Sequence, residues 1–353
     1  MIKIAITQGD INGIGYEVIL KCFQDTRMLE LCTPVLYGSS RLVTFYRKLC
    51  QLPQIPVNII ETANDARNGV LNIVETIPAD IQPQPGADTP EGGKAAMASL
   101  EAAVSALRSG EVDALVTAPI NKHNIQSETF IFAGHTEYLE ASLGDGDRSL
   151  MILFNERMRI ALATTHLPVS HIAEAITVDS LVDKLRIFNN SLKQDFSIVA
   201  PRIAVLALNP HAGDNGLLGA EENDIIVPAI NAVRDEKILA FGPYPADGFF
   251  GAGNFDKFDG ILAMYHDQGL APFKTMAMDS GVNFTAGLKF VRTSPDHGTG
   301  FDIAGQGVAS EQSMRQAIYA AIDIVRSRLN HAEATANPLR RSKPTETNSK
   351  KPQ

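Results

Sequence analysis

Short apolar runs alternate along this chain with longer segments in which apolar residues recur at helical spacing. Runs without polar alternation are typical of strands that are buried on both faces of a sheet. Because strands and helices alternate, the pattern predicts right-handed crossovers and a largely parallel sheet, which is the α/β class. The predicted strands span residues 2–7, 34–38, 57–60, 114–118, 149–155, 159–165, 202–208 and 261–265.

The helices are clearest where helix-forming residues end at a glycine. Residues 93–108 are rich in Ala, Met and Leu and stop at Ser109-Gly110, which predicts one long helix. Another is expected to begin after Gly134, with Thr136 as its N-cap. Residues 80–93 contain many Pro, Gly and Asp residues and predict a flap or an exposed crossover. A closing helix is expected over 312–329, followed by a disordered tail over 331–353.

Composition and charge narrow the class of protein. Of the 353 residues, 44% are hydrophobic and 20% are charged, which is typical of a globular protein. The formal charge of −9 argues against nucleic acid or an anionic membrane as the partner. The three cysteines have no CxxC spacing, and the first strand starts directly after Met1 without a signal peptide. We therefore expect a soluble, cytoplasmic protein.

Three predicted strands each run into a histidine. The strands over 159–165, 202–208 and 261–265 lead to His166, to His211 and to His266. Ligands of open α/β sheets bind at the carboxyl ends of strands, so three histidines in matching positions predict one shared divalent metal ion. Neutral imidazoles suit zinc, cobalt or nickel best, and three of them leave room for a substrate. Zinc is the metal that we expect, with magnesium or cobalt as alternatives.

Downstream of His266 the chain concentrates residues that can hold an anion. Lys274, Asn283 and Arg292 are expected in loops or at strand ends, where they would form a pocket for a phosphate or a carboxylate. His135 has either a binding role or a place at a helix entry. Residues 296–307 contain four glycines, which allow a close approach of the backbone to a ligand or form a flexible hinge.

Six motifs stand out along the chain: Thr117-Ala-Pro-Ile-Asn-Lys, Gly134-His-Thr-Glu-Tyr-Leu, Thr164-Thr-His-Leu-Pro, Asn209-Pro-His-Ala-Gly, Tyr265-His-Asp-Gln-Gly-Leu and Arg292-Thr-Ser-Pro-Asp-His-Gly-Thr. They resemble the 4-hydroxythreonine-4-phosphate dehydrogenases of pyridoxal phosphate synthesis, in register from residue 1 to about residue 329. Residues 296–305 are also similar to the nucleotide loop of isocitrate and isopropylmalate dehydrogenases, which bind NAD without a Rossmann fingerprint.

The resemblance implies two α/β domains, residues 1–125 with 300–330 and residues 126–299, and an active site in the cleft between them. It also implies a homodimer in which His266 of one subunit completes a site built from the other. Its site residues fall here on the metal ligands His166, His211 and His266 and on the substrate contacts His135, Thr136, Lys274, Asn283 and Arg292. NAD or NADP would lie at Asp296, His297, Gly298 and Thr299.

The implied reaction is a metal-dependent oxidation of 4-phosphohydroxy-L-threonine, followed by loss of carbon dioxide. Lys274 and Asp247 are the candidates for taking the hydroxyl proton. The first turn departs from the family pattern at Ile11, Asn12 and Tyr16, and Gly248 stands where the family usually has Thr. Three alternatives stay open: a sibling dehydrogenase of erythronate or threonate 4-phosphate, a metal-dependent hydrolase or lyase, and a non-catalytic protein that binds anions.

Overall fold

The computed structural model describes residues 1–127, 130–132, 134–277 and 280–337. Its strands form one twelve-stranded sheet in the order β3-β4-β2-β1-β5-β12-β11-β6-β7-β10-β8-β9. Their bounds are β1 Lys3–Thr7, β2 Thr33–Gly38, β3 Val57–Ile60, β4 Leu71–Glu75, β5 Ala114–Thr117, β6 Leu150–Phe154, β7 Arg159–Leu162, β8 Arg202–Leu206, β9 Leu239–Tyr244, β10 Gly260–Ala263, β11 Val282–Ala286 and β12 Val291–Pro295.

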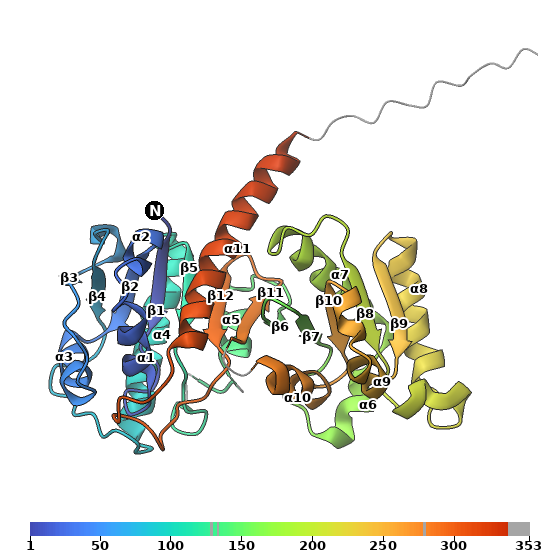
Figure 1. Ribbon diagram of the computed structural model, residues 1–353, viewed down its shortest axis with the longest axis horizontal. Helices are drawn as coiled ribbons and strands as arrows, with labels where there is room; N and C mark the ends of the chain where they lie inside the picture. The colour runs from blue at the N-terminus through green and yellow to red at the C-terminus, as the bar shows by residue number, and fades with distance from the viewer. Residues whose placement is uncertain (128–129, 133, 278–279, 338–353) are drawn as a thin grey trace, which may run out of the picture.

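Helices cover both faces of this sheet (Figure 1). The longest are α4 and α11, which match the two helices that the sequence predicts most clearly. The α-helices are α1 Gly15–Cys22, α2 Met28–Leu31, α3 Ser40–Leu49, α4 Pro90–Ser109, α5 His135–Leu143, α6 Ile172–Ala175, α7 Val178–Gln194, α8 Val227–Asp235, α9 Ala246–Gly251, α10 His266–Ala277 and α11 Gln312–Ala336. Short 3-10 and π turns are η1 Ala63–Asp65, η2 Val169–His171, η3 Pro210–Gly216, η4 Glu222–Ile226 and η5 Asn254–Lys257.

Alternate side chains of the buried strands enter different cores. In β1, Ile4 and Ile6 pack on the side of α1 and α11, whereas Ala5 packs on the side of α4. All three are fully buried, as expected for a strand that is covered on both faces. The prediction that this continuous apolar run forms a strand covered on both faces of the sheet is therefore confirmed.

The sheet changes direction at its centre. Parallel pairing joins β12 to β5, but β11 is antiparallel to both β12 and β6, and β6 is antiparallel to β7. The parallel strands of the two halves therefore run in opposite directions. The predicted hairpin is confirmed as β6 and β7, and α11 packs across the join against β5, β11 and β12 (Figure 1).

Several boundaries differ from the sequence prediction. The strand expected over 261–265 ends at Ala263, and His266 opens α10 rather than closing a strand. Helix α5 begins at His135 with Gly134 as its N-cap, so Thr136 lies in the first turn and is not the cap. Helix α11 continues beyond the predicted end to Ala336, and the residues of its last turns are exposed. Residues 338–353 of the expected tail lie outside the described ranges.

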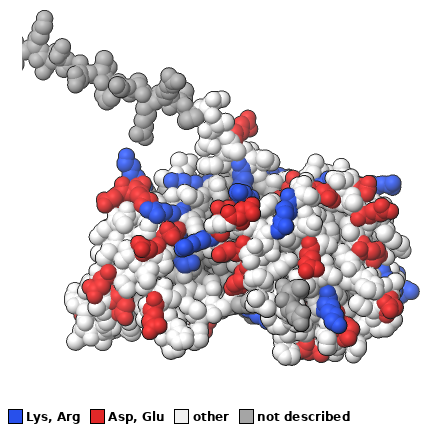
Figure 2. All heavy atoms as spheres, turned by 180° about the vertical axis from the view of Figure 1, so that it is seen from behind, with Lys and Arg blue, Asp and Glu red and all other residues white. Residues whose placement is uncertain are grey.

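The surface shows a mixture of charges. On the face drawn in Figure 2, acidic and basic side chains are interspersed. No helix among the described residues is long and apolar enough to cross a membrane.

Candidate active site

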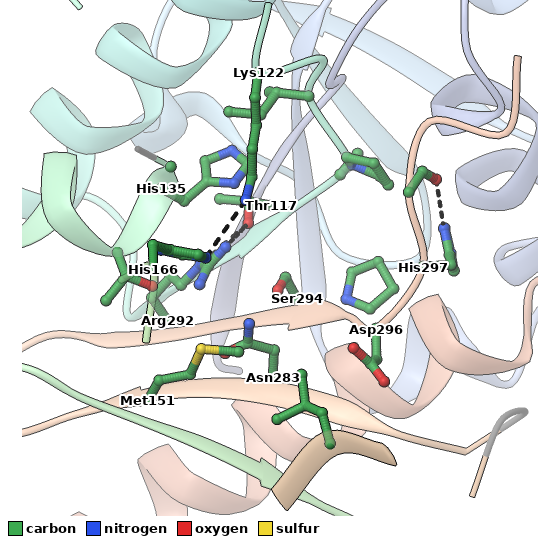
Figure 3. Close-up of a pocket in the computed structure, with 18 of the residues that line it drawn as sticks. Thr117, Lys122, His135, Met151, His166, Asn283, Arg292, Ser294, Asp296 and His297 are labelled. Carbon is green, nitrogen blue, oxygen red and sulfur yellow. Dashed lines mark hydrogen bonds between the residues drawn. The ribbon is translucent and has the colours of Figure 1, made fainter. Parts of the chain in front are cut away.

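One pocket lies where the two halves of the sheet meet (Figure 3). Its lining comes from the end of β5 and the segment after it, the first turn of α5, strands β6, β11 and β12, the segment after β7, one face of α10, and the loop after β12. The polar and charged lining residues are Thr117, Lys122, His135, Thr136, Glu137, His166, His266, Lys274, Asn283, Arg292, Ser294, Asp296 and His297. All five residues that the resemblance assigns to the substrate are therefore brought together.

Arg292 lies at the floor of the pocket and is 4% exposed. Its Nε and Nη2 donate to the Thr117 hydroxyl at 3.1 and 2.7 Å, and its Nη1 donates to the Thr285 hydroxyl at 3.2 Å. Both acceptors are neutral, and no ion pair joins Arg292 to a carboxylate within the described ranges. Burial lowers the pKa of Arg292 to about 10, against the opposing charge of Glu137. A buried guanidinium without a carboxylate favours an anionic ligand.

Helix α10 presents an imidazole and an amino group of a lysine from one face. His266, Leu270 and Lys274 recur every four residues, so all three line the pocket. Lys274 was expected in a loop or at a strand end, but it lies on this helix. Its Nζ is 3.3 Å from Oδ1 of Asp296, and burial raises the pKa of Asp296 although the lysine opposes the shift.

The first turn of α5 supplies His135 and Thr136. Burial, with smaller contributions from the charges of Arg292 and Lys122, holds the pKa of His135 well below its usual range, so the ring is neutral at pH 7. Nε2 of His135 and Oδ1 of Asn283 are both buried without a hydrogen-bond partner among the described residues. Buried polar atoms in proteins are nearly always paired, so these two mark places for polar atoms of a ligand.

Two of the predicted metal ligands lie in the pocket, with ring centroids 6.1 Å apart. Nδ1 of His166 faces Oε1 of Glu137 at 2.9 Å, and Nδ1 of His266 faces Oδ1 of Asp267 at 2.7 Å. A carboxylate at Nδ1 is the usual orienting partner of a histidine that binds metal through Nε2. The donor chemistry of this pair therefore fits a divalent ion.

The third predicted ligand does not join them in this chain. His211 is exposed, lies in η3, and is absent from the pocket lining. The strand order does not cause this, since β8 pairs with β10, which leads to His266; the cause is that His211 lies beyond the end of β8, in the exposed η3 segment. Within the described parts of one chain, no group of three His, Cys, Asp or Glu side chains is placed to share an ion. The strand-end pattern thus locates two histidines in one pocket and leaves His211 outside it.

The loop after β12 borders the pocket through Asp296, His297 and Gly298. Nε2 of His297 is buried without a partner among the described residues, and a Cβ added to Gly298 would meet open space. Thr299 instead turns inward, where its carbonyl accepts a hydrogen bond from the amide of Ile14. The first three residues of the predicted nucleotide segment are available to a ligand, whereas Thr299 anchors the loop.

Of the two candidates for taking a proton, only Lys274 lines the pocket. Asp247 is exposed at the start of α9 and is not among the lining residues. The turn predicted around it forms this short helix instead, which keeps the carboxylate outside the pocket in this chain.

Sequence reasoning also missed residues of the site. Lys122 reaches across the pocket to within 3.4 Å of Nε2 of His166 (Figure 3), and Glu137 orients that imidazole. Thr117 holds Arg292, and Ser294 lies two residues farther along the same face of β12. Lys122 and Thr117 belong to the motif Thr117-Ala-Pro-Ile-Asn-Lys, which is the one signal that could have indicated them.

Comparison with known proteins agrees with this geometry. The family model of the pyridoxal phosphate biosynthetic protein PdxA matches residues 30–321. The 4-hydroxythreonine-4-phosphate dehydrogenase of Bacteroides thetaiotaomicron is 57% identical over 340 residues, which cover 96% of this chain and 93% of the relative. The enzyme of the same name from Prosthecochloris aestuarii is 41% identical and covers 92% of this chain and 98% of its own length.

Solved structures extend the comparison to the fold. The crystal structure of 4-hydroxythreonine-4-phosphate dehydrogenase from Klebsiella pneumoniae is 32% identical, has a TM-score of 0.78, and covers 92% of this chain and 98% of the solved chain. Isocitrate dehydrogenase from Methylococcus capsulatus is 10% identical with a TM-score of 0.50, and covers 94% and 88%. The latter likeness shows the fold alone, and it confirms the predicted isocitrate dehydrogenase-like architecture.

Proposed function

This chain belongs to the PdxA family of pyridoxal phosphate biosynthetic proteins, the 4-hydroxythreonine-4-phosphate dehydrogenases, and on that premise we propose that it oxidises 4-phosphohydroxy-L-threonine. The C3 hydroxyl loses a proton to a base, and the C3 hydride passes to NAD or NADP. The resulting ketone is β to the carboxylate, which leaves as carbon dioxide, and C2 of the enolate then takes up a proton to give 3-amino-2-oxopropyl phosphate.

The environment of Arg292 is the observation that carries this proposal. Its buried guanidinium has only hydroxyl acceptors, and a phosphate would supply the missing anionic partner. Lys122 provides a second cation that forms no ion pair with a carboxylate in the described residues, since its nearest polar contact is His166. A substrate with a phosphate at one end and a carboxylate at the other matches these two unpaired cations.

Other side chains of the pocket orient the substrate. Neutral His135 and the amide of Asn283 have free buried atoms for its polar groups, and Thr136 adds a hydroxyl beside His135. Lys274 is the residue that we propose to take the hydroxyl proton, because it lines the pocket and Asp247 does not. Asp296 fixes the position of its Nζ, which acts as the base in its unprotonated amine form.

We also propose a bound divalent ion, with zinc as the preferred metal. His166 and His266 would hold it through Nε2 while Glu137 and Asp267 fix the orientation of their rings. His211 would supply the third ligand in a homodimer whose site is shared between the subunits. Such an ion would supply Lewis-acid chemistry that makes the substrate hydroxyl more acidic.

The experiment that tests the proposed substrate compares 4-phosphohydroxy-L-threonine with its unphosphorylated parent, 4-hydroxythreonine, using metal-loaded protein. Formation of reduced nicotinamide is followed by absorbance. We expect turnover with the phosphorylated compound and a loss of at least about a hundredfold in kcat/KM with the parent, because Arg292 is then left without its anion. Equal turnover of both compounds would overturn the proposed role of the phosphate.

A further inference from the structure

A buried asparagine, Asn12, connects two segments of the chain. One is the first turn, between β1 and α1, and the other is residues 84–89, which are called the flap from here on. Asn12 is 1% exposed. Its Oδ1 accepts from the amide of Gln84 at 2.7 Å, and its Nδ2 donates to the carbonyl of Ala87 at 3.0 Å and to the Thr89 hydroxyl at 2.9 Å. The Asn12 carbonyl also accepts from the amide of Gly86 at 2.8 Å. One residue therefore holds four positions of the flap.

The flap in turn lies against the glycine-rich loop of residues 296–307. Gly86 has a φ of +84°, and a Cβ placed there would come within 2.8 Å of the Phe301 carbonyl. A Cβ on Gly305 would come within 3.2 Å of Cβ of Pro85. The two segments thus touch at two points, and both contacts require glycine on one side.

The same turn also holds the other side of the loop. The amide of Ile14 donates to the Thr299 carbonyl at 2.9 Å, and a Cβ on Gly13 would lie 2.7 Å from that oxygen. The glycine-rich loop is therefore enclosed between the first turn and the flap, and Asn12 is the side chain that joins these two.

A further set of buried contacts reaches the segment that carries Lys122. Asp10 accepts from the Asn12 amide at 2.9 Å and from Nδ2 of Asn124 at 2.8 Å. Nδ2 of Asn124 also donates to the Thr89 carbonyl at 3.0 Å. The flap is therefore held by Asn124, in the segment that carries Lys122, as well as by Asn12 in the first turn.

We propose that Asn12 is a positioning residue for the nucleotide: by holding the flap against residues 296–307 it shapes the surface that receives the dinucleotide. This inference rests on the proposed function, which places NAD or NADP at that loop. Asn12 does not touch the substrate pocket itself. Its loss should therefore weaken nucleotide binding more than it changes the KM of the substrate or kcat.

The test starts from two pairs of variants. Asn12→Ala removes all three side-chain hydrogen bonds, and alanine suits the backbone because Asn12 does not have a positive φ. Its control is Asn72→Ala, which removes an equally buried asparagine that bonds Arg67, Val70 and Pro34. That asparagine lies in β4, away from the loop.

The second pair protects the test against a folding failure of Asn12→Ala. Gly86→Ala should push the exposed flap away from Phe301, while the turn that holds Asn12 stays unchanged. Its control is Gly69→Ala, because Gly69 has a similar φ of +78° but no atom within 4 Å of an added Cβ. The two glycine variants therefore carry the same backbone strain and differ in the contact with the loop.

Binding of reduced nicotinamide nucleotide is titrated by fluorescence without substrate, and amide hydrogen exchange is measured over residues 84–89 and 296–307. We expect Asn12→Ala and Gly86→Ala to raise the Kd of the nucleotide about tenfold and to speed amide exchange in both segments. A tenfold change in Kd corresponds to about the net free energy of one hydrogen bond. Neither control should do so. Wild-type Kd and exchange in both test variants would overturn the role of Asn12. A wild-type protein that binds no nucleotide would instead contradict the proposed function, and this inference with it.

Discussion

The guanidinium of Arg292 donates twice to the hydroxyl of Thr117, across 175 positions of sequence and between neighbouring strands of the sheet. The pair joins β12 to the end of β5 at the floor of the pocket. Threonine fixes the orientation of the arginine but leaves its charge uncompensated. The positive charge is therefore available to a ligand.

Replacing Arg292 should have a steep effect on catalysis. Arg292→Ala leaves the bound anion without its buried partner, so kcat/KM should fall by about a hundredfold or more. Arg292→Lys should recover only part of this loss, because lysine lacks the planar fork. Steady-state kinetics measure both effects, and His331→Ala, at an exposed position of α11, is the control that should behave as wild type. Unchanged kcat/KM in Arg292→Ala would contradict the anion pocket.

Lys122 should contribute to binding of the substrate. Lys122→Met removes a cation that faces the pocket, and the KM for the phosphorylated substrate should rise by about tenfold. Lys122→Arg keeps the charge and should retain more of the affinity. Lys94→Met, at an exposed lysine of α4, controls for a general change of charge. If both methionine variants have the same KM, then Lys122 does not bind the substrate.

Stability should depend on pH through His135, whose pKa burial holds well below the ordinary 6.5. Below pH 6.5 the imidazole of His135 takes up a proton more readily in the unfolded chain than in the folded chain. The contribution of neutral His135 to the free energy of unfolding is therefore complete above pH 6.5. It is lost as the pH falls below that value, by at most about 1.4 kcal/mol per pH unit.

Urea unfolding of metal-free protein at about pH 7 and about pH 5.5 measures this dependence. His135→Gln should show a smaller loss of unfolding free energy on acidification than wild type. His331→Gln changes an exposed histidine and should retain the wild-type dependence. Identical losses in wild type and His135→Gln would show that His135 is not held neutral by the fold.

The proposed shared metal site predicts recovery of activity in mixed dimers. His166→Ala and His211→Ala should each be inactive alone, whereas a hybrid of the two retains one intact site if His211 of one subunit completes the His166 and His266 pair of the other. Activity after subunit exchange, in the presence of zinc, measures the recovery, and a chelator should remove it. Exchange without recovery would show that the partner subunit does not supply His211.

The sequence predicts the fold well where one face or both faces of an element are uniformly apolar. Strands such as β1 and β10 follow continuous apolar runs, and helix α4 follows its alanine-rich pattern. Strand β4 was not predicted because Asn72 interrupts its apolar run. That asparagine is nonetheless fully buried, since backbone and side-chain hydrogen bonds satisfy its amide.

The site was predictable in its chemistry more than in its geometry. The charged and imidazole side chains around His266 and Arg292 indicated an anion pocket, and the structure brings them together. The partner of Arg292 depends on the pairing of β12 with β5, which no local pattern contains. For His211 the local pattern matched that of His166, but His211 lies beyond the end of β8 in η3, and the path of that segment cannot be read from the pattern.

The most direct test of the proposed activity is the absorbance of reduced nicotinamide with metal-loaded protein and either 4-phosphohydroxy-L-threonine or erythronate 4-phosphate. We predict metal-dependent reduction of NAD or NADP with the hydroxythreonine phosphate, accompanied by release of carbon dioxide. Reduction with erythronate 4-phosphate alone would show that the chain is the sibling sugar-acid dehydrogenase. Reduction with neither compound would contradict the proposed dehydrogenase activity itself.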